Sequence, residues 1–376
     1  MSFLKRIAAA LILVGAVAPA VHAETLKIGV IAPLTGPGAP WGMALAEAAK
    51  IAAAESNAEG GLDVGGTEYD VEVLAYDDQY KASEAVAIYN NLLRQDVKYM
   101  MFVSSSGTLA LKQNFEDDEV LAMTAAFTKK PFDSDTTFLF RIASTPDSYV
   151  PHMAPWLAEN ISERRLVIVN PNDETGWDLT QVAEESFGKA GFEILGQELF
   201  ERSQRDFQPM LTKIIGSGAE IIDLGGTAPP TAGLIIRQAR ELGYEGKFIK
   251  TGGPGPREIL EAAGSKELVE GLLFIGYADT STEGYQRVAA EYTQTHGHEP
   301  NEMIAPYYDG VKVLLTAIAK AGDVDDTEKV AASFKEVLPM PSLQGGDLKF
   351  GTQQFLSPMF IFEMQDGKPA IAGDLK

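Results

Sequence analysis

Short β-rich runs alternate with amphipathic stretches along the chain, and this alternation constrains the possible folds more than any other feature. In the first part of the chain, three strand-like runs are each followed by a helix-like stretch. The expected strands are 26–31, 71–76 and 99–103, and the expected helices are 44–56, 82–94 and 108–115. Strands that alternate with helices in this way form a parallel sheet covered by helices.

The alternation restarts at residue 166 and continues through the middle of the chain. The strands expected there are 166–170, 192–195, 221–224 and 248–250, with helices over 177–189, 207–215 and 232–242. The sequence therefore predicts an α/β fold with two doubly wound, Rossmann-like lobes. A Pro-Asp helix start at 146–147 follows a strand-like run, so we expect a hinge near Ala143 to Thr145.

The carboxyl-terminal third contains more helices than the second sheet can use. A buried strand is expected at 272–277, and helices follow at 284–295, 304–320 and 327–337. Part of this tail is therefore expected to return to the first lobe.

The amino terminus has the pattern of a secretory signal. Lys5 and Arg6 precede an apolar run over 7–21, and Val21-His22-Ala23 ends that run with small residues at the −3 and −1 positions. The run is shorter than the ~20 apolar residues that a membrane-spanning helix needs. We therefore predict cleavage after Ala23 and export, instead of a membrane anchor.

Composition excludes several classes of partner and chemistry. The 376 residues include 53 acidic and 31 basic side chains, which gives a formal net charge of −22. A chain this acidic repels nucleic acid and anionic membranes. The absence of cysteine excludes disulfides, thiolate metal sites and a cysteine nucleophile. The length exceeds what one hydrophobic core usually serves, which agrees with two domains.

Three loops that follow strands of the first lobe carry polar and aromatic side chains. In parallel α/β sheets, ligands bind at the carboxyl ends of the strands, beside helix N-termini. The loops supply the candidate binding residues Trp41; Ser104, Ser105 and Ser106; and Ala126, Phe127 and Thr128. Hydroxyls, backbone N–H groups and aromatic faces suit a small carboxylate with an apolar body. The alternative is that the serines and threonines only cap helices.

Enzyme motifs are weak or missing. The run Gly36 to Gly42 follows a strand, but its third glycine stands one place late for a dinucleotide fingerprint, and neither a G-x-S-x-G elbow nor a P-loop is present. His152 could serve a Ser-His-Asp arrangement, and His296-Gly-His298 could hold a metal, but surface positions are favoured for all three histidines. We therefore expect no metal and no cofactor.

The combined motifs resemble the periplasmic leucine/isoleucine/valine-binding proteins, which are type I solute-binding proteins of ABC transporters. The resemblance spans nearly the whole mature chain in order. It rests on Ile28-Gly-Val-Ile-Ala-Pro-Leu-Thr-Gly, Tyr76-Asp-Asp, Ser104 to Ser106, Thr124 to Thr128, Arg237-Gln-Ala-Arg240 and Tyr308-Asp309-Gly310. It implies a three-crossover hinge, a ligand trapped by lobe closure and delivery to a permease in the inner membrane. It also implies one lobe of 24–144 with about 274–355, and another of 145–273 with about 356–376.

The resemblance also implies roles for individual residues of the first lobe. An aromatic residue before the glycine of the first helix corresponds to Trp41. The family's carboxylate-binding positions correspond to Ser104, to the backbone of Ala126 and to Thr128. The carboxylate half of the site is therefore expected to be intact.

The second half of the site departs from the family pattern. Thr175-Gly176-Trp177 replaces a Tyr-Gly pair, and Gly252 stands where amino-acid binders have the glutamate that pairs with the ligand's ammonium group. An unpaired buried ammonium is costly, so a branched-chain amino acid is disfavoured. Asp223 or Asp279 could replace the missing acid, or the tryptophans could enclose a quaternary ammonium. Thr227 and Tyr277 are further candidates for the cleft, and core packing is the alternative for Tyr277.

The function predicted from these observations is ligand capture without covalent chemistry. The chain is expected to be the periplasmic binding component of an ABC importer, working as a monomer and taking an aromatic or aliphatic carboxylic acid or an unusual amino acid. Two alternatives stay open, a secreted hydrolase or amidase on a similar scaffold and a ligand-binding sensory component.

Overall fold

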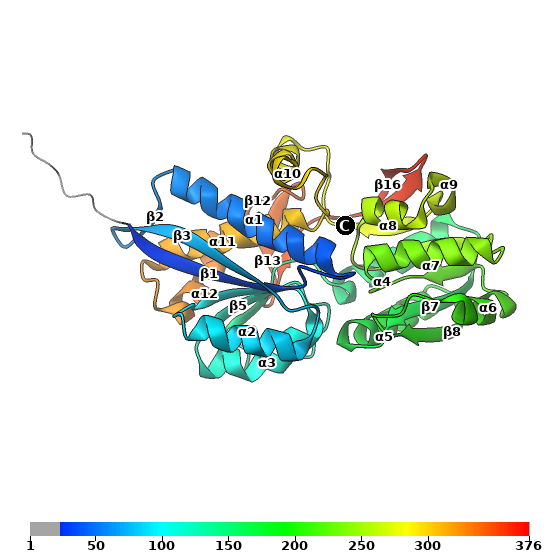
Figure 1. Ribbon diagram of the computed structural model, residues 1–376, viewed down its shortest axis with the longest axis horizontal. Helices are drawn as coiled ribbons and strands as arrows, with labels where there is room; N and C mark the ends of the chain where they lie inside the picture. The colour runs from blue at the N-terminus through cyan, green and yellow to red at the C-terminus, as the bar shows by residue number, and fades with distance from the viewer. Residues whose placement is uncertain (1–22, 376) are drawn as a thin grey trace, which may run out of the picture.

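The first lobe is built on a six-stranded sheet. The computed structural model describes residues 23–375, and Figure 1 shows two α/β lobes side by side. The sheet order is β2 (Leu62–Val64), β3 (Thr67–Asp77), β1 (Glu24–Ala32), β4 (Tyr99–Phe102), β5 (Leu121–Thr124) and β6 (Leu139–Arg141). All neighbours run parallel except β2 and β3. Its central strands β4 and β5 are apolar and buried along their whole length because helices cover both faces.

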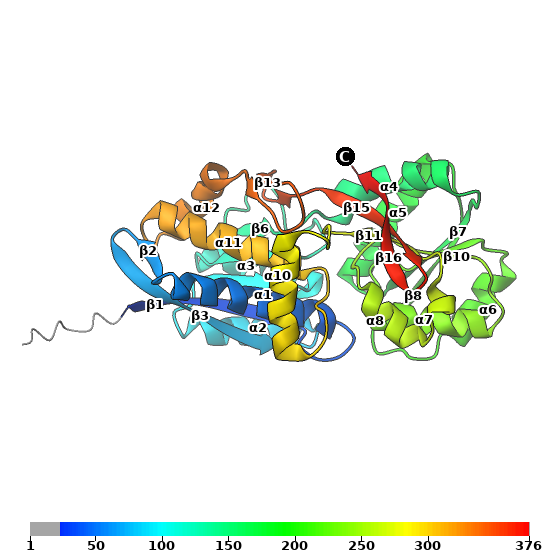
Figure 2. The same ribbon diagram turned by 90° about the horizontal axis from the view of Figure 1, so that it is seen from above.

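Helices from both ends of the chain cover this sheet. The helices of the first lobe are α1 (Ala39–Ala58), α2 (Ala82–Leu93), α3 (Ser105–Asp117), α10 (Glu283–His296), α11 (Ile304–Ala321) and α12 (Thr327–Val337). Figure 2 shows α11 lying beside α1, and these two helices pack closely. Most residues of α11 are buried. The expected return of the tail to the first lobe is therefore observed.

The second lobe is built on a seven-stranded sheet. Its order is β16 (Lys368–Leu375), β15 (Met359–Gln365), β11 (Leu273–Gly276), β10 (Lys247–Lys250), β9 (Ile221–Asp223), β7 (Arg165–Pro171) and β8 (Glu193–Phe200). The last strands, β15 and β16, pair antiparallel at one edge. The helices are α4 (Pro146–Asn160), α5 (Glu174–Lys189), α6 (Gln208–Gly216), α7 (Pro229–Glu241), α8 (Pro256–Ala263) and α9 (Lys266–Val269). These two sheets confirm the predicted α/β class with two doubly wound lobes.

The chain passes between the lobes after β6, after β11 and after a small sheet of β12 (Met340–Pro341), β13 (Asp347–Phe350) and β14 (Phe355–Leu356). The boundaries expected from the sequence for the second and third crossovers lie near 274 and 356. All of β11 pairs with β10 or β15, and Phe274 stacks on Phe362 with ring centroids 5.5 Å apart. We therefore propose boundaries after Gly276 and between Leu356 and Met359, since an apolar run alone does not reveal which sheet it joins.

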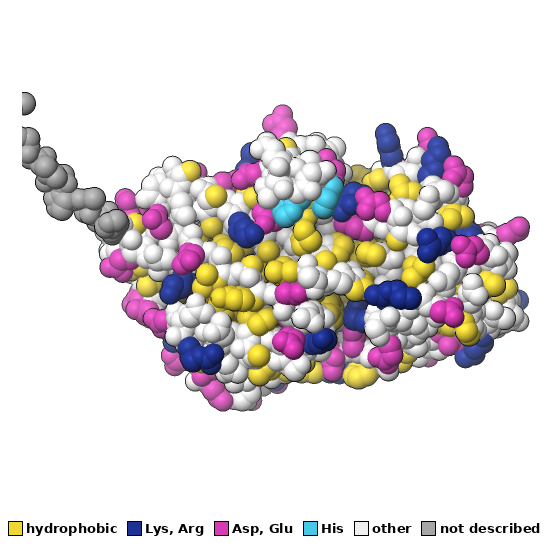
Figure 3. All heavy atoms as spheres, in the orientation of Figure 1, with side chains coloured by type: hydrophobic (Ala, Val, Ile, Leu, Met, Phe, Trp, Pro, Cys, Tyr) yellow, Lys and Arg dark blue, Asp and Glu magenta, His cyan; other side chains and the backbone are white. Residues whose placement is uncertain are grey.

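Acidic and basic side chains are mixed over the face shown in Figure 3, without one dominant patch of either sign. No helix within 23–375 has both the length and the apolar character needed to cross a membrane. The predicted signal segment, apart from Ala23, lies outside the described residues.

Candidate functional site

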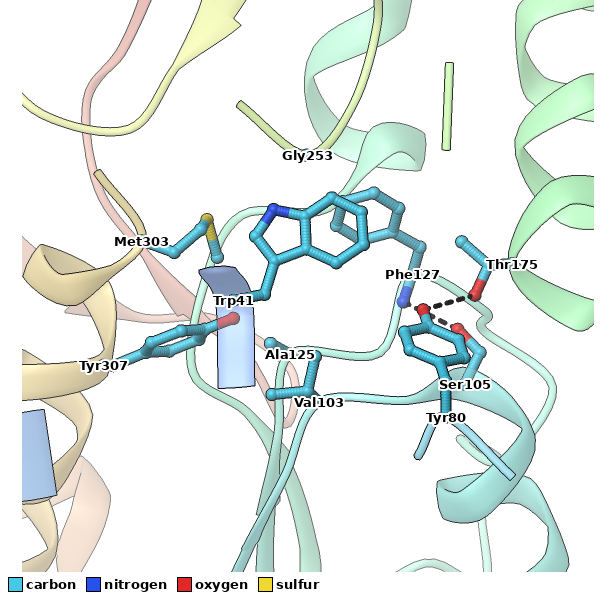
Figure 4. Close-up of a pocket in the computed structure, with 10 residues that line it drawn as sticks. All are labelled: Trp41, Tyr80, Val103, Ser105, Ala125, Phe127, Thr175, Gly253, Met303 and Tyr307. Carbon is cyan, nitrogen blue, oxygen red and sulfur yellow. Dashed lines mark hydrogen bonds between the residues drawn. The ribbon is translucent and has the colours of Figure 1, made fainter. Parts of the chain in front are cut away.

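A cavity lies where loops of the two lobes meet at the carboxyl ends of their strands. The part of it that the centre of a water-sized sphere can occupy is about 20 Å³. Figure 4 shows its walls, which are largely aromatic and aliphatic. The lining residues are Trp41, Tyr80, Val103, Ser105, Ala125, Phe127, Thr175, Gly253, Met303 and Tyr307. A volume of about 20 Å³ is room for about one water molecule, so a larger ligand enters only when the walls move apart.

Ser104 and Ser105 have different roles, although they are adjacent. Ser104 is the N-cap of α3: its hydroxyl oxygen accepts a hydrogen bond from the Gly107 N–H at 3.2 Å, and its hydroxyl lies 3.3 Å from the carboxylate of Asp78. It is fully buried and does not line the cavity. Ser105, the first residue of α3, lines the cavity instead. For Ser104, the capping alternative therefore holds.

Ser105 also organises the backbone of the neighbouring loop. Its hydroxyl oxygen accepts hydrogen bonds from the N–H groups of Phe127, at 3.2 Å, and Thr128, at 3.4 Å. Within the described part of the chain, no acceptor takes the hydroxyl proton of Ser105. One hydroxyl and two N–H groups thus gather at the start of α3, where the helix dipole favours negative charge.

Three other candidates of the first lobe lie outside the cavity wall. The Ala126 N–H donates to the Thr124 hydroxyl at 3.0 Å, and the Thr128 hydroxyl donates to Asp178 of α5. Ser106 is half-buried in the first turn of α3. These residues belong to loops beside the cavity, and the side chain that faces the cavity depends on where each turn begins.

Trp41 joins the two lobes at one end of the cavity. Its indole N–H donates to the carbonyl oxygen of Pro254 at 3.3 Å. Its ring lies directly against Gly253, where an added Cβ would meet the ring at 2.4 Å. Gly253 also has a φ of +58°, which favours glycine. Both properties explain why glycine occupies this position.

Tyr80 joins the lobes at the other end, and sequence reasoning missed it. Its hydroxyl lies 3.3 Å from the hydroxyl of Thr175, and the guanidinium of Arg202 lies 3.9 Å from its ring centre. Tyr80 follows β3 in a turn with a φ of +60°, which is uncommon for a bulky residue. That backbone conformation aims the ring at the second lobe, and nothing in the local sequence indicates it.

One candidate of the second lobe, Thr175, lines the cavity, and the other candidates of that lobe do not. Thr175 is buried and lines the cavity, whereas the Trp177 side chain is 44% exposed and donates to Asn172 at 2.9 Å. Tyr277 is fully buried, and its hydroxyl donates to the carbonyl oxygen of Ser144 at 3.0 Å, so it belongs to the core near the hinge.

Thr227 and Gly252 stand behind the wall. The Thr227 hydroxyl lies 3.5 Å from the carbonyl of Val169, away from the cavity lining. Gly252 packs against Phe127, whose ring lies 2.8 Å from the position of an added Cβ. A glutamate at Gly252 would therefore have to displace Phe127.

No charged side chain is among the ten residues that line the cavity. Asp223 is fully buried, and its carboxylate accepts hydrogen bonds from the Thr251 hydroxyl at 2.8 Å and the Gly225 N–H at 3.0 Å. Burial raises the pKa of Asp223 to about 6. Asp279 accepts from the Ser281 hydroxyl at 2.6 Å. Neither acid takes the place of the missing amine partner in the cavity wall.

None of the histidines within residues 23–375 lines the cavity. His152 is exposed on α4, and His296 stacks on Tyr292 with ring centroids 4.3 Å apart. Within residues 23–375, no group of three or more histidine, aspartate or glutamate side chains is arranged to hold a metal ion.

The fold and the cavity define a two-lobed protein that can enclose a small molecule. A family model described as periplasmic binding protein matches residues 25–369. The leucine-, isoleucine-, valine-, threonine- and alanine-binding protein of Pseudomonas aeruginosa is 27% identical over 335 residues, which cover 88% of each chain. The chain therefore belongs to the periplasmic binding protein family, in the type I group of leucine/isoleucine/valine-binding proteins.

Solved structures agree with this assignment. A leucine-binding protein from Thermotoga maritima superposes with a TM-score of 0.81 at 25% identity, over 94% of this chain and 99% of that one. A solute-binding protein from R. palustris in complex with benzoate gives a TM-score of 0.79 at 16% identity, over 94% of this chain and 96% of that one. The second likeness concerns the fold alone.

Proposed function

We propose that the protein is the periplasmic substrate-binding component of an ABC importer and captures a small monocarboxylate that lacks an ammonium group. The observation that carries the proposal is the composition of the cavity wall. The Ser105 hydroxyl, whose oxygen already accepts from the Phe127 N–H, can donate its proton to a carboxylate, aromatic and aliphatic groups can cover the ligand's apolar body, and no acid lines the wall. The site contains no nucleophile with an adjacent base, so binding takes place without turnover.

The ligand class follows from the cost of burial. A carboxylate that accepts a hydrogen bond from the Ser105 hydroxyl is compensated for part of its lost hydration, by about 1.5–3 kcal/mol. An ammonium in the same cavity would lose its hydration without a counter-ion, which costs several kcal/mol. An aromatic or aliphatic acid is therefore favoured over the amino acids named for the relatives.

The delivery step is proposed from the family and the expected export signal. Residues 1–23 carry the pattern of a secretory segment, and family members are described as periplasmic. In this proposal the protein closes around the ligand as a monomer and presents it to an inner-membrane permease.

A thermal-shift series tests the proposal. Protein purified without added ligand is heated with increasing 3-phenylpropanoate, 4-methylpentanoate, benzoate or glycine betaine. An acid that binds only the folded protein raises the Tm with the logarithm of its concentration. The proposal is wrong if no acid raises the Tm, or if mass spectrometry finds that the bound acid is converted.

A further inference from the structure

Lys250, the last residue of β10, is completely buried, and its ammonium group is held by three backbone carbonyls. Its Nζ donates to the oxygens of Gly225 at 2.9 Å, Thr227 at 2.6 Å and Gly252 at 2.6 Å. An ammonium has three donors and no acceptor. The three carbonyls therefore match the charged form, and a neutral amine would leave one of them without a donor.

These carbonyls belong to two loops of the second lobe: the loop after β10, which supplies Gly253 to the cavity wall, and the loop after β9, which lies behind Thr175. Gly252 precedes Gly253, which lines the cavity against Trp41. The other loop, which follows β9, approaches Thr175, because a Cβ added at Gly226 would lie 3.1 Å from its methyl group. Lys250 thus ties together both loops from behind the wall.

The charge of Lys250 has no direct ion-pair partner among the described residues. Asp223 on the neighbouring strand β9 influences it, but that carboxylate is hydrogen-bonded to Thr251 and Gly225. The other charged group that acts on Lys250 is Arg202, which is paired with Asp173. A cation therefore stands behind an apolar wall that contains no charge.

We propose that Lys250 is a specificity-determining residue: it fixes the two loops of the second lobe and supplies the buried positive charge that favours an anionic ligand over a zwitterion. This inference rests on the proposed function, since it assumes that a carboxylate enters the cavity. In water the attraction would be small, but behind a dry wall the effective dielectric constant is low and the attraction is larger.

Linkage between the ligand and the lysine proton makes the proposal measurable. Burial lowers the pKa of Lys250 to about 7, Asp223 opposes this change and Arg202 adds to it. A bound anion favours the ammonium form and raises this pKa, so binding takes up a proton between the two pKa values. The affinity for an acid is highest below pH 7 and falls as the pH rises through the two pKa values of Lys250. The total loss is about tenfold for each unit by which the ligand raises the pKa.

Calorimetry in buffers of different ionisation enthalpy counts these protons. 3-Phenylpropanoate is titrated into the full protein in phosphate and in Tris at pH 7.5, and in two further buffers of unequal ionisation enthalpy at pH 5.5. For a rise of one unit in the lysine pKa, we expect Lys250 to take up roughly 0.5 proton at pH 7.5 and almost none at pH 5.5, where any uptake comes from Asp223, whose pKa is about 6. The variant Lys250→Met should take up none and should lose affinity for the acid.

Two further variants identify the group that takes up the proton. Lys247→Met removes a lysine from the other end of β10, where its side chain lies 3.8 Å from Glu163. Glu302→Gln removes a second buried group whose pKa, raised mainly by burial, is about 8. Both variants should retain the proton uptake of the unmodified protein.

The outcomes separate the two proposals. If the unmodified protein binds none of the acids of the thermal-shift series, the proposed function fails and the role of Lys250 falls with it. If the acid binds without proton uptake at pH 7.5, or if Lys250→Met keeps that uptake, Lys250 does not select the ligand and the carboxylate assignment stands. Where Lys250→Met does not fold, an absence of proton uptake by the unmodified protein at pH 7.5 still contradicts the role of Lys250.

Discussion

The indole N–H of Trp41 donates to the carbonyl oxygen of Pro254 at 3.3 Å, and this bond joins α1 of the first lobe to the loop after β10 of the second. Asn301, just before α11, donates to the same oxygen at 3.0 Å. One carbonyl therefore accepts hydrogen bonds from two segments of the other lobe. The closed arrangement around the cavity depends on this contact.

Trp41→Phe should weaken ligand binding modestly. The phenyl ring keeps most of the packing against Gly253 but cannot donate to Pro254, so one neutral hydrogen bond of about 0.5–1.5 kcal/mol is lost. Calorimetry with the acid that gives the largest thermal shift should record an affinity that is lower by roughly two- to tenfold. Unchanged affinity would mean that the bond does not contribute to closure.

Gly253→Ala should weaken binding more than it weakens folding. Its Cβ would meet the Trp41 ring at 2.4 Å, and overpacking of this kind costs about 1–3 kcal/mol. Gly243→Ala is the matched control, because Gly243 also has a positive φ, of +83°, but no atom lies within 4 Å of an added Cβ. Both variants should lose similar stability in urea, and only Gly253→Ala should lose affinity. Equal affinities would contradict the closed contact.

Ser105→Ala should mainly lose affinity for the ligand, whereas Ser104→Ala should mainly lose folding stability. The first removes the hydroxyl in the cavity wall and should cost about 1.5–3 kcal/mol of carboxylate binding. The second removes the N-cap of α3 and should cost about 1 kcal/mol of stability while the affinity changes little. Urea unfolding and calorimetry on both variants measure the two effects. A large affinity loss in Ser104→Ala with none in Ser105→Ala would reverse the assignment.

Glu302→Gln should stabilise the protein at high pH only. Burial, and to a lesser extent Glu258, raises the pKa of Glu302 from 4.5 to about 8, and its Oε2 has no hydrogen-bond partner among the described residues. Because the folded pKa of this acid is raised, its contribution is most favourable below pH 4.5. Stability is then lost as the pH rises towards 8, by about 1.4 kcal/mol per unit.

Glutamine removes that loss. Urea unfolding at pH 4 and pH 8 should therefore give equal stabilities for the two proteins at pH 4 and a more stable variant at pH 8. A gain of the same size at both pH values would show that ionisation of Glu302 is not its cause.

The sequence predicted the two sheets well because buried parallel strands are apolar runs that alternate regularly with helices. It predicted less where that signal is weak. The short helices α8 and α9 and the antiparallel strands β15 and β16 lie outside the βαβ alternation. The predicted boundary near 274 differed by a few residues because the strand at 273–276 closes one lobe before the chain crosses to the other.

The site was predicted at the level of loops and less well at the level of side chains. The exact residue at which α3 begins decides whether Ser104 or Ser105 faces the cavity. Tyr80 reaches the cavity through a left-handed turn. Met303 and Tyr307 reach it from the tail that returns to the first lobe. Spacing along the chain reveals neither a positive φ nor a contact across two hundred residues.

The most direct test of the central claim compares ligands that differ only in the amine. Leucine is 4-methylpentanoate with an added ammonium group, and phenylalanine is related to 3-phenylpropanoate in the same way. Calorimetry at pH 6.5 should give at least about tenfold tighter binding for the acid of each pair, because the cavity wall has no acid to pair with the ammonium. Tighter binding of leucine or phenylalanine than of its acid would contradict the proposed ligand class.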